Sequence, residues 1–272
     1  RRQRTEWARS VVANFRDGKA KQALQEYQKR GFLNFSNDSR ASKQDLISKW
    51  NSFRKVNPNK KSLILAQRWD DVTELNSLVR QILQDDGKVS KKEIEVSCSV
   101  SNRHIKYKMA VGERIKFTKN VYRIVYSNGD LGTITSIEKL ADGDITFIIE
   151  SDSGKTIQFK ASDYSSDQGH VYLTQAYAQT VYASQGLTVD GDVFVYYTTG
   201  MDRAHTYVAC SRHKDNCHLF ANKMELMESK IDKHDLLLNK LINQILTNNI
   251  KKLAIEHKKH RSKPNKKYYL DF

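Results

Sequence analysis

A continuous apolar run, Val193–Tyr197, constrains the fold more than any other stretch of this chain. Such an uninterrupted run is typical of a strand that is covered on both faces. A second run ends at Leu219–Phe220, and residues 201–212 between the two runs have helical spacing. Upstream, residues 180–185 predict a short helix that ends at Gly186, because glycine suits the left-handed conformation of a helix end. Strands that alternate with helices in this way predict a parallel α/β sheet.

The first half of the chain extends this pattern. Residues 1–30 predict two polar helices that are interrupted at Asp17–Gly18, and a further helix is expected over Lys43–Arg54. The run Ser62–Ala66 predicts another buried strand, which a helix over Asp71–Leu83 follows. Together these elements add one strand and its covering helix to the predicted sheet.

Residues 109–159 have a different pattern, with short runs of alternating or β-branched residues. Turn residues separate these runs at short intervals, which is the spacing of an all-β unit. The glycines at the turns are Gly112, Gly129, Gly132, Gly143 and Gly154. The sequence therefore predicts a small β unit inside the α/β sheet. After residue 222, a long helix is expected over Asp235–His257, and a basic tail follows it.

The overall charge indicates the class of partner. The 272 residues carry 46 Lys and Arg against 31 Asp and Glu, a net charge of +15. This balance favours a polyanionic partner such as nucleic acid, although a generic basic surface is compatible with it. Three cysteines are too few for a disulfide framework, and no apolar run reaches membrane-spanning length. We therefore expect a cytoplasmic protein without a membrane partner. The absence of an initial methionine suggests a fragment.

Two clusters carry the chemistry: TVYASQGLTVD at residues 180–190 and DRAHTYVACSRH at residues 202–213. Together they resemble motifs V and VI of superfamily 1 DNA helicases of the RecD-like branch. They are close in form to the conjugative-transfer relaxase/helicases of the TraA/TraI type. The stretch LILAQRWDDVTELNSLVR at residues 63–80 resembles motif IV of the same family. Residues 109–168 resemble the SH3-like β-barrel that is inserted in the second motor domain of these helicases.

The resemblance implies roles for particular residues. In the family, motif V contacts the phosphates of single-stranded DNA, and the motif VI arginine reaches the γ-phosphate of ATP. Tyr182 stands where many relatives have histidine, but a tyrosine can still stack on a base. The implied DNA-binding residues are Thr180, Tyr182, Ser184, Gln185, Lys116 and Lys119, with Gly186 beside them in motif V. The implied half of an ATP site consists of Gln67, Arg68, Gly186 and Arg212, of which Arg212 is the catalytic arginine finger.

The chemistry of Arg212 agrees with this role. A guanidinium has a fixed charge and a planar fork that matches phosphate oxygens, so it can stabilise charge that develops during phosphoryl transfer. Two structural alternatives remain: Arg212 could cap the end of its helix, or it could pair with Asp215. Lys116 and Lys119 could likewise lie on a solvated strand face.

Other motifs in the chain are incomplete. The GKT at residues 154–156 lacks the preceding glycine of a phosphate-binding loop and lies among predicted strands. The spacing of Cys210, His213, Cys217 and His218 matches no common zinc site, so no metal site is predicted. Neither a Walker A sequence nor a Walker B acidic pair is evident in the sequence. We therefore expect that ATP and Mg²⁺ are bound mainly by a first motor domain, and that this chain alone does not hydrolyse ATP.

These observations predict an α/β fold with four parts. They are a helical lead-in segment (1–60), a RecA-like second motor domain (61–108 plus 169–222), an inserted SH3-like barrel (109–168) and a C-terminal helix with a basic tail (223–272). The leading hypothesis is the second motor domain of an ATP-dependent helicase for conjugative plasmid transfer. Its partners would be single-stranded DNA and the first motor and relaxase domains of the intact protein. The alternative is a truncated, catalytically inactive nucleic-acid-binding remnant. An unrelated RNA-binding protein is disfavoured by motifs V and VI.

Overall fold

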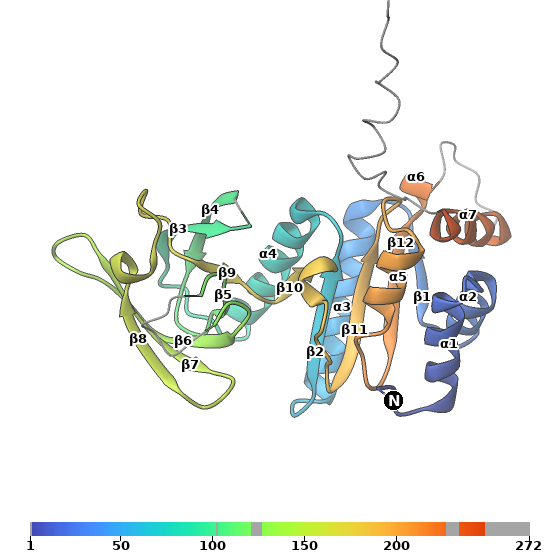
Figure 1. Cartoon of the computed structure of the whole chain (residues 1–272), viewed down its shortest axis with the longest axis horizontal. Coiled ribbons are helices and arrows are strands. Elements are labelled where there is room, and N and C mark those ends of the chain that lie inside the picture. Colours follow the sequence, from blue (N-terminus) through green and yellow to red (C-terminus); the bar gives the residue numbers. More distant parts are fainter. Residues whose placement is uncertain (1, 102, 121–126, 227–233, 248–272) are drawn as a thin grey trace, which may run out of the picture.

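Five parallel strands form the central sheet of the chain (Figure 1). The computed structural model describes residues 2–101, 103–120, 127–226 and 234–247. The strand order is β1-β12-β11-β2-β10, and every neighbouring pair is parallel. The predicted parallel α/β sheet is therefore confirmed. Its strands are β1 (Leu33–Ser36), β2 (Lys61–Ala66), β10 (Ala178–Thr180), β11 (Gly191–Tyr197) and β12 (Cys217–Asn222).

Strand β11 lies at the centre of the sheet and is buried along its whole length. Because side chains alternate between the two faces of a strand, β11 supplies apolar groups to two separate cores. Val193 and Val195 pack into one core, whereas Phe194 packs into the other. The continuous apolar run that predicted this strand is thus explained by the helices that cover both faces of the sheet.

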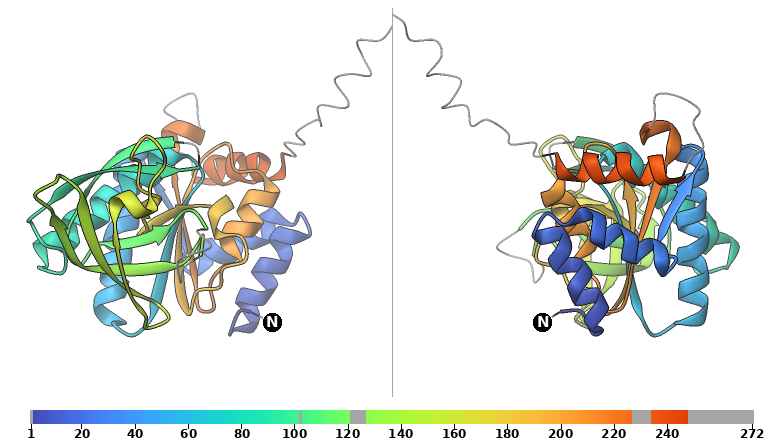
Figure 2. Two further views of the ribbon diagram at one scale, coloured as in Figure 1. Left: turned by 60° about the vertical axis from the view of Figure 1, so that its left-hand side comes forward. Right: turned by 90° about the vertical axis from the view of Figure 1, so that its right-hand side faces the viewer.

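The helices lie in two layers on either side of the sheet (Figures 1 and 2). On one side, α3 (Ser39–Val56) and α4 (Trp69–Asp85) bury apolar faces that include Leu46 and Leu75. On the other side lie α1 (Glu6–Arg16), α2 (Ala20–Lys29), α5 (Arg203–Cys210) and α7 (His234–Leu246). The amphipathic spacing of the predicted helices therefore has the expected cause, a single apolar face turned toward the sheet.

Two details near the first strand differ from the prediction. Strand β1 was not expected, because two of the four residues in its sequence, LNFS, are polar. It pairs with β12 alone, at the edge of the sheet. Helix α3 begins at Ser39 and not at Lys43, because Asp38 caps it: the carboxylate accepts a hydrogen bond from Ala41 N at 2.8 Å.

A second, antiparallel sheet forms the body on the left of Figure 1. Its order is β8-β7-β6-β5-β9, and a two-stranded hairpin of β3 and β4 packs against it. The core contains aromatic rings from Phe117, Phe147 and Phe159, with tilted or stacked contacts. The predicted all-β unit is therefore present, whereas its SH3-like closure into a barrel stays a prediction. The strands are β3 (Ile94–Val100), β4 (Arg103–Met109), β5 (Arg114–Phe117), β6 (Leu131–Lys139), β7 (Ile145–Ser151), β8 (Thr156–Lys160) and β9 (Leu173–Gln175).

The packing indicates a wider β unit than residues 109–168. Val96 and Tyr107, on the β3–β4 hairpin, belong to the same core as the larger antiparallel sheet. Leu173 on β9 belongs to it as well. The division of the chain at residues 109 and 168 stays a prediction. By packing alone, the β unit extends over residues 94–175.

The C-terminal part of the described chain is helical. Helix α6 (Lys223–Leu226) follows β12 directly, and α7 packs against α2 and α5. The helix expected over Asp235–His257 starts at His234 and is described as far as Leu246. The remainder of that prediction and the basic tail lie outside the described residues. Within the described ranges, none of the helices is both long and apolar enough to cross a membrane.

Candidate functional site

The residues of motif V form a tight turn between β10 and β11. Thr180 is the last residue of β10, and one 3-10 turn over Tyr182–Ser184 replaces the short helix that the sequence predicted. Gly186 has a φ of +86°, which confirms the predicted left-handed residue after the turn. The Thr180 hydroxyl accepts a hydrogen bond from Ala183 N at 3.1 Å and so fixes the geometry of this turn.

The predicted DNA-contacting residues of the turn differ in exposure. Tyr182 is 79% exposed, and Gln185 is also exposed. Ser184, in contrast, is fully buried, and its hydroxyl donates to Val181 O at 2.7 Å. The turn therefore presents Tyr182 and Gln185 to a ligand, while Ser184 supports it from inside. The DNA contacts predicted for all three stay predictions.

Helix α5 carries motif VI and ends just before Arg212. Asp202 caps its N-terminus by accepting a hydrogen bond from His205 N at 3.0 Å. The helix stops at Cys210, two residues earlier than predicted. Arg212 is only 8% exposed, and each of its hydrogen-bond partners is an uncharged oxygen. These partners are Val208 O at 2.8 Å, Ser211 Oγ at 2.9 Å, Leu187 O at 3.3 Å and Ser184 O at 3.4 Å.

The structure decides between the two alternatives for Arg212. Asp215 pairs with Lys60 at 2.6 Å and with Arg4, and Arg212 occurs in none of the ion pairs among the described residues. The bond from Arg212 Nε to Val208 O, however, does satisfy a carbonyl at the C-terminal end of α5. Arg212 thus caps its helix and also holds the motif V turn, without a carboxylate partner.

A second arginine lies beside Arg212. Arg2 Nη1 donates to Ser211 O at 2.8 Å. Burial, and then the positive charge of Arg2, lower the pKa of Arg212. Two guanidinium groups without a carboxylate between them favour an anion at this place, because an anion would relieve their mutual repulsion. Arg2 was not predicted as a site residue, since the 209 positions that separate it from Ser211 leave no local signal of the contact.

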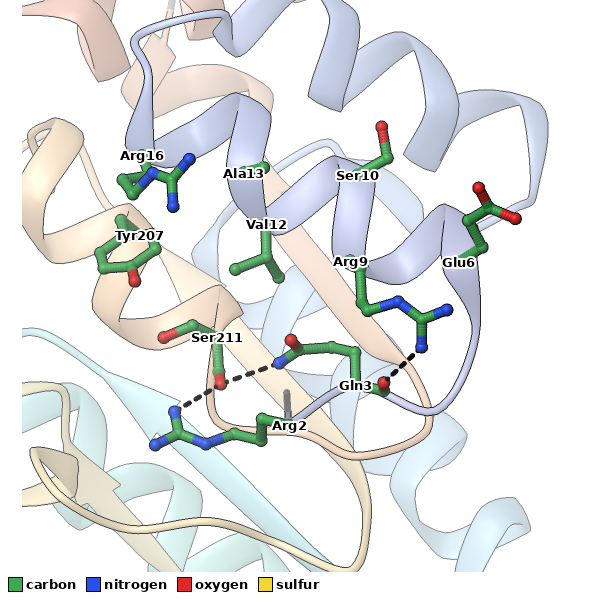
Figure 3. Close-up of a pocket in the computed structure, with 10 residues that line it drawn as sticks. All are labelled: Arg2, Gln3, Glu6, Arg9, Ser10, Val12, Ala13, Arg16, Tyr207 and Ser211. Atoms are coloured by element: carbon green, nitrogen blue, oxygen red, sulfur yellow. Dashed lines mark hydrogen bonds between the residues drawn. The ribbon is translucent and has the colours of Figure 1, made fainter.

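A pocket of about 650 Å³ opens next to these residues, between α1 and α5 (Figure 3). Three arginines contribute to its wall, against the single carboxylate of Glu6. Figure 3 shows the guanidinium of Arg2 and the amide of Gln3 directed at the backbone of Ser211. The pocket is therefore suited to an anionic ligand. Its lining residues are Arg2, Gln3, Glu6, Arg9, Ser10, Val12, Ala13, Arg16, Tyr207 and Ser211.

The side chains of Gln67 and Arg68 have partners outside the motif V turn. Both residues follow the C-terminal end of β2, close to where α5 begins, whereas Arg212 follows the end of α5. Gln67 Nε2 donates to Gly200 O at 2.7 Å, and Arg68 pairs with Glu225 at 2.6 Å. Ala66, which directly precedes Gln67, accepts a hydrogen bond from Val181 N of the motif V turn at 2.9 Å, whereas the side chains of Gln67 and Arg68 bind Gly200 and Glu225. The assignment of Gln67 and Arg68 to the ATP half-site stays a prediction.

The two predicted lysines lie on the β unit. Lys116 on β5 donates to the side chain of Gln179 at 3.2 Å, next to Thr180, and burial lowers the pKa of Lys116. Lys119 donates to the hydroxyl of Tyr172 at 2.9 Å and lies 4.3 Å from the centre of its ring. Lys116 is therefore close to the motif V turn, while Lys119 is held by an aromatic neighbour within the β unit.

The incomplete motifs have structural explanations. Gly154 has a φ of +78° in the hairpin between β7 and β8, so the GKT sequence forms a strand-to-strand turn as expected. His218 Nε2 lies 2.9 Å from Asp192, and Cys210 and Cys217 are buried in the core. Among the described residues, no group of three or more metal-ligating side chains is placed to hold a metal ion.

Comparison with known proteins shows which families this chain is similar to. Residues 94–221 match the family described as the viral superfamily 1 RNA helicase core domain. The conjugal transfer protein TraA of Agrobacterium fabrum (strain C58) and that of Rhizobium radiobacter are each 28% identical over 219 residues. These alignments cover 80% of this chain but 18% of each relative, so the chain spans less than a fifth of their length.

Solved structures of Bacteroides Pif1 helicase have a similar fold. The complex with ADP-AlF3 and single-stranded DNA has a TM-score of 0.53 at 18% identity, and the complex with single-stranded DNA has 0.55 at 16%. Each alignment covers 96% of this chain and 55% of the Pif1 chain. The parallel sheet therefore resembles the RecA-like fold of Pif1. Residues 94–221 thus match a superfamily 1 helicase family, and the chain is similar in sequence to the TraA conjugal transfer proteins.

Proposed function

We propose that this chain is the second motor domain of an ATP-dependent DNA helicase that acts in conjugative transfer. One observation carries the proposal: Arg212 is buried beside Arg2, has only uncharged acceptors, and contacts both the motif V turn and the motif VI helix. An arginine that merely stabilised the fold would more commonly be paired with a carboxylate when buried. Arg212 instead has no carboxylate partner among the described residues.

The anion that fits this place is the γ-phosphate of ATP. A guanidinium offers a planar fork to phosphate oxygens, and its charge stabilises the transferring phosphoryl group. Arg2 adds a second positive charge, and the pocket beside it is lined with further arginines. When bound, ATP with Mg²⁺ would supply the bond that is cleaved. A first motor domain would hold most of the nucleotide, as the greater length of the TraA relatives allows.

The exposed residues of the motif V turn suit single-stranded DNA. Tyr182 is an aromatic ring that is 79% exposed, and stacking on such rings is a main source of affinity for single strands. Lys116 lies close to Thr180 through Gln179, and the net charge of +15 supports binding to a phosphate backbone. The same turn also accepts hydrogen bonds from Arg212 through Ser184 O. The proposed DNA contact and the proposed nucleotide contact therefore lie on the same turn.

The partners follow from this placement. The first motor domain would face Arg2 and Arg212, and a relaxase domain would belong to the same protein, as in TraA/TraI-type helicases. Such an enzyme would work in the cytoplasm, where plasmid DNA is processed. The competing proposal, an inactive remnant that only binds nucleic acid, predicts that Arg212 has no effect on hydrolysis.

The test uses the reconstituted motor, that is, this chain joined to a first motor domain with Walker A and B motifs. Arg212→Lys keeps the charge but loses the two-pronged geometry. We expect hydrolysis of ATP per folded motor to fall by a factor on the order of 10³. The melting temperature should fall as well, because Arg212 caps α5 and holds the motif V turn. Arg54→Lys is the matched control, because Arg54 forms an ion pair with Asp86 on the other side of the sheet. Undiminished hydrolysis by a folded Arg212→Lys motor would refute the proposal.

A further inference from the structure

The segment that precedes α1 runs along the loop that carries Arg212, and its contacts involve almost every carbonyl of that loop. Arg2 Nη1 donates to Ser211 O at 2.8 Å, and Arg4 N donates to Lys214 O at 2.9 Å. Between them, Gln3 Nε2 donates to two carbonyls, those of Ser211 and His213, both at 3.1 Å. These two carbonyls lie immediately before and after Arg212.

The remaining carbonyl of the loop is held from the other side. Arg212 O accepts a hydrogen bond from Val189 N at 2.9 Å. Val189 follows the motif V turn by only a few residues. The backbone at Arg212 is therefore fixed between Val189 on one side and Gln3 on the other. Of these two groups, only Gln3 acts through a side chain, so only its contribution depends on residue type.

Gln3 is well suited to this task. Its side-chain amide has two N–H groups, and two carbonyls accept from it, so its donor capacity is fully used. The residue is 7% exposed, which protects both bonds from competing water. Its own carbonyl accepts a hydrogen bond from Arg9 Nη1 at 3.0 Å, which anchors the segment to α1. No other side chain among the described residues contacts the backbone on both sides of Arg212.

We propose that Gln3 is a positioning residue for Arg212, holding the backbone on both sides of the arginine so that its guanidinium is directed at the phosphate. The inference rests on the proposed function of Arg212 as an arginine finger. Catalytic groups must be held within a fraction of an ångström of their productive geometry, and a displacement of about 1 Å can cost on the order of 10²-fold in rate. Gln3 itself does not touch the nucleotide.

The substitution Gln3→Met tests this in the reconstituted motor, because methionine has a similar length but no donor. We expect kcat for ATP hydrolysis to fall by roughly 10- to 100-fold, with KM for ATP and affinity for single-stranded DNA nearly unchanged. Gln3→Glu, which keeps the shape but not the donors, is expected to fail in the same way. A purely structural role predicts a lower melting temperature and an unchanged kcat per folded molecule.

Gln84→Met is the matched control. Gln84 Nε2 also donates to a backbone carbonyl, that of Ser90 at 3.1 Å, but it lies at the end of α4 and far along the chain from the motif VI loop. We expect this variant to lose stability comparable to Gln3→Met without loss of kcat. If both variants lower kcat equally, the effect is one of general destabilisation, and the inference is wrong.

A double variant separates this inference from the proposed function. If Gln3 acts through Arg212, then Gln3→Met added to Arg212→Lys should lower kcat no further. If the two substitutions instead lower kcat by independent factors that multiply, the positioning role of Gln3 is wrong. The assignment of Arg212 as the arginine finger would then stand without it. An Arg212→Lys motor with full activity would instead refute the proposed function itself. In this chain alone, Gln3→Met should also shift and broaden the NMR signal of Arg212 Nε–H, and an unchanged signal would contradict the inference.

Discussion

Arg2 and Arg212, which are far apart in the sequence, share Ser211 as a hydrogen-bond partner. Arg2 Nη1 donates to the carbonyl of Ser211 at 2.8 Å, and Arg212 Nη2 donates to its hydroxyl at 2.9 Å. Both positively charged side chains thus donate to Ser211, and the oxygens that accept from them there are uncharged. This arrangement raises the electrostatic free energy of the empty site, and an anion that binds between the guanidinium groups would lower it.

The exposed ring of Tyr182 should carry part of the affinity for single-stranded DNA. Tyr182→Ala is expected to weaken binding of this chain to a labelled oligonucleotide by about 1–3 kcal/mol, the usual contribution of one stacked base. Tyr182→Phe should retain the affinity, because the ring remains. Both proteins should bind more weakly as salt rises, since the basic residues are unchanged. Val56→Ala is the control, because Val56 is equally exposed at the end of α3. Equal binding by Tyr182→Ala and the parent chain would exclude stacking at this residue.

The Thr180 hydroxyl should matter through the shape of the turn. Thr180→Ala removes the acceptor for Ala183 N, which costs on the order of 1 kcal/mol and allows the turn to relax. We expect weaker DNA affinity and weaker stimulation of hydrolysis by DNA in the reconstituted motor, with basal hydrolysis spared. Thr73→Ala, which removes a hydroxyl that donates to Trp69 O on the exposed side of α4, is the control. A loss of basal hydrolysis in Thr180→Ala would show that the turn acts on the nucleotide instead.

His213 should make the fold sensitive to acid. Burial lowers the pKa of His213 to about 4, although Asp192 and Asp215 act in the opposite direction and His218 adds to the lowering. The unfolded chain has a histidine pKa of about 6.5, so it binds a proton first as pH falls. The contribution of His213 to stability is therefore complete above about pH 6.5. It falls by about 2 kcal/mol on going to pH 5.

Urea unfolding at pH 7.5, 6 and 5 measures this effect. The variant His213→Gln should lose less stability than the parent chain over the same range, because it has no proton to gain. His104→Gln, at an exposed histidine on β4, should behave like the parent chain. If His213→Gln and the parent chain show the same pH dependence, His213 is not the group responsible.

The elements that were predictable from sequence are those with a strong local pattern. The run Val193–Tyr197 is apolar because helices cover both faces of β11, and that cause is visible in any short window. Strand β1 was missed because its polar residues Asn34 and Ser36 break the pattern at an edge of the sheet. Its pairing with β12 is a contact between distant segments, which no local window contains.

The candidate site was predictable only in part for the same reason. Motifs V and VI identified Arg212 and the turn at Thr180, because both are short and chemically distinctive. Arg2 and Gln3 were missed, since their roles arise from contacts across more than 200 residues. Gln67 was grouped with Arg212 because a strand end is a common ligand site in parallel sheets, and that grouping stays a prediction. The Gln67 side chain donates to Gly200 O before α5, whereas Arg212 follows α5.

The most direct test of the account measures how tightly the reconstituted motor binds ADP with aluminium fluoride, a mimic of the transferring phosphoryl group. An arginine finger contacts the group in transit and not the diphosphate that remains. We therefore predict that Arg212→Lys weakens binding of ADP–aluminium fluoride by a factor on the order of 10³ while binding of ADP alone stays the same. Equal affinity of the parent and variant motors for ADP–aluminium fluoride would contradict the central claim that Arg212 stabilises the transferring phosphate.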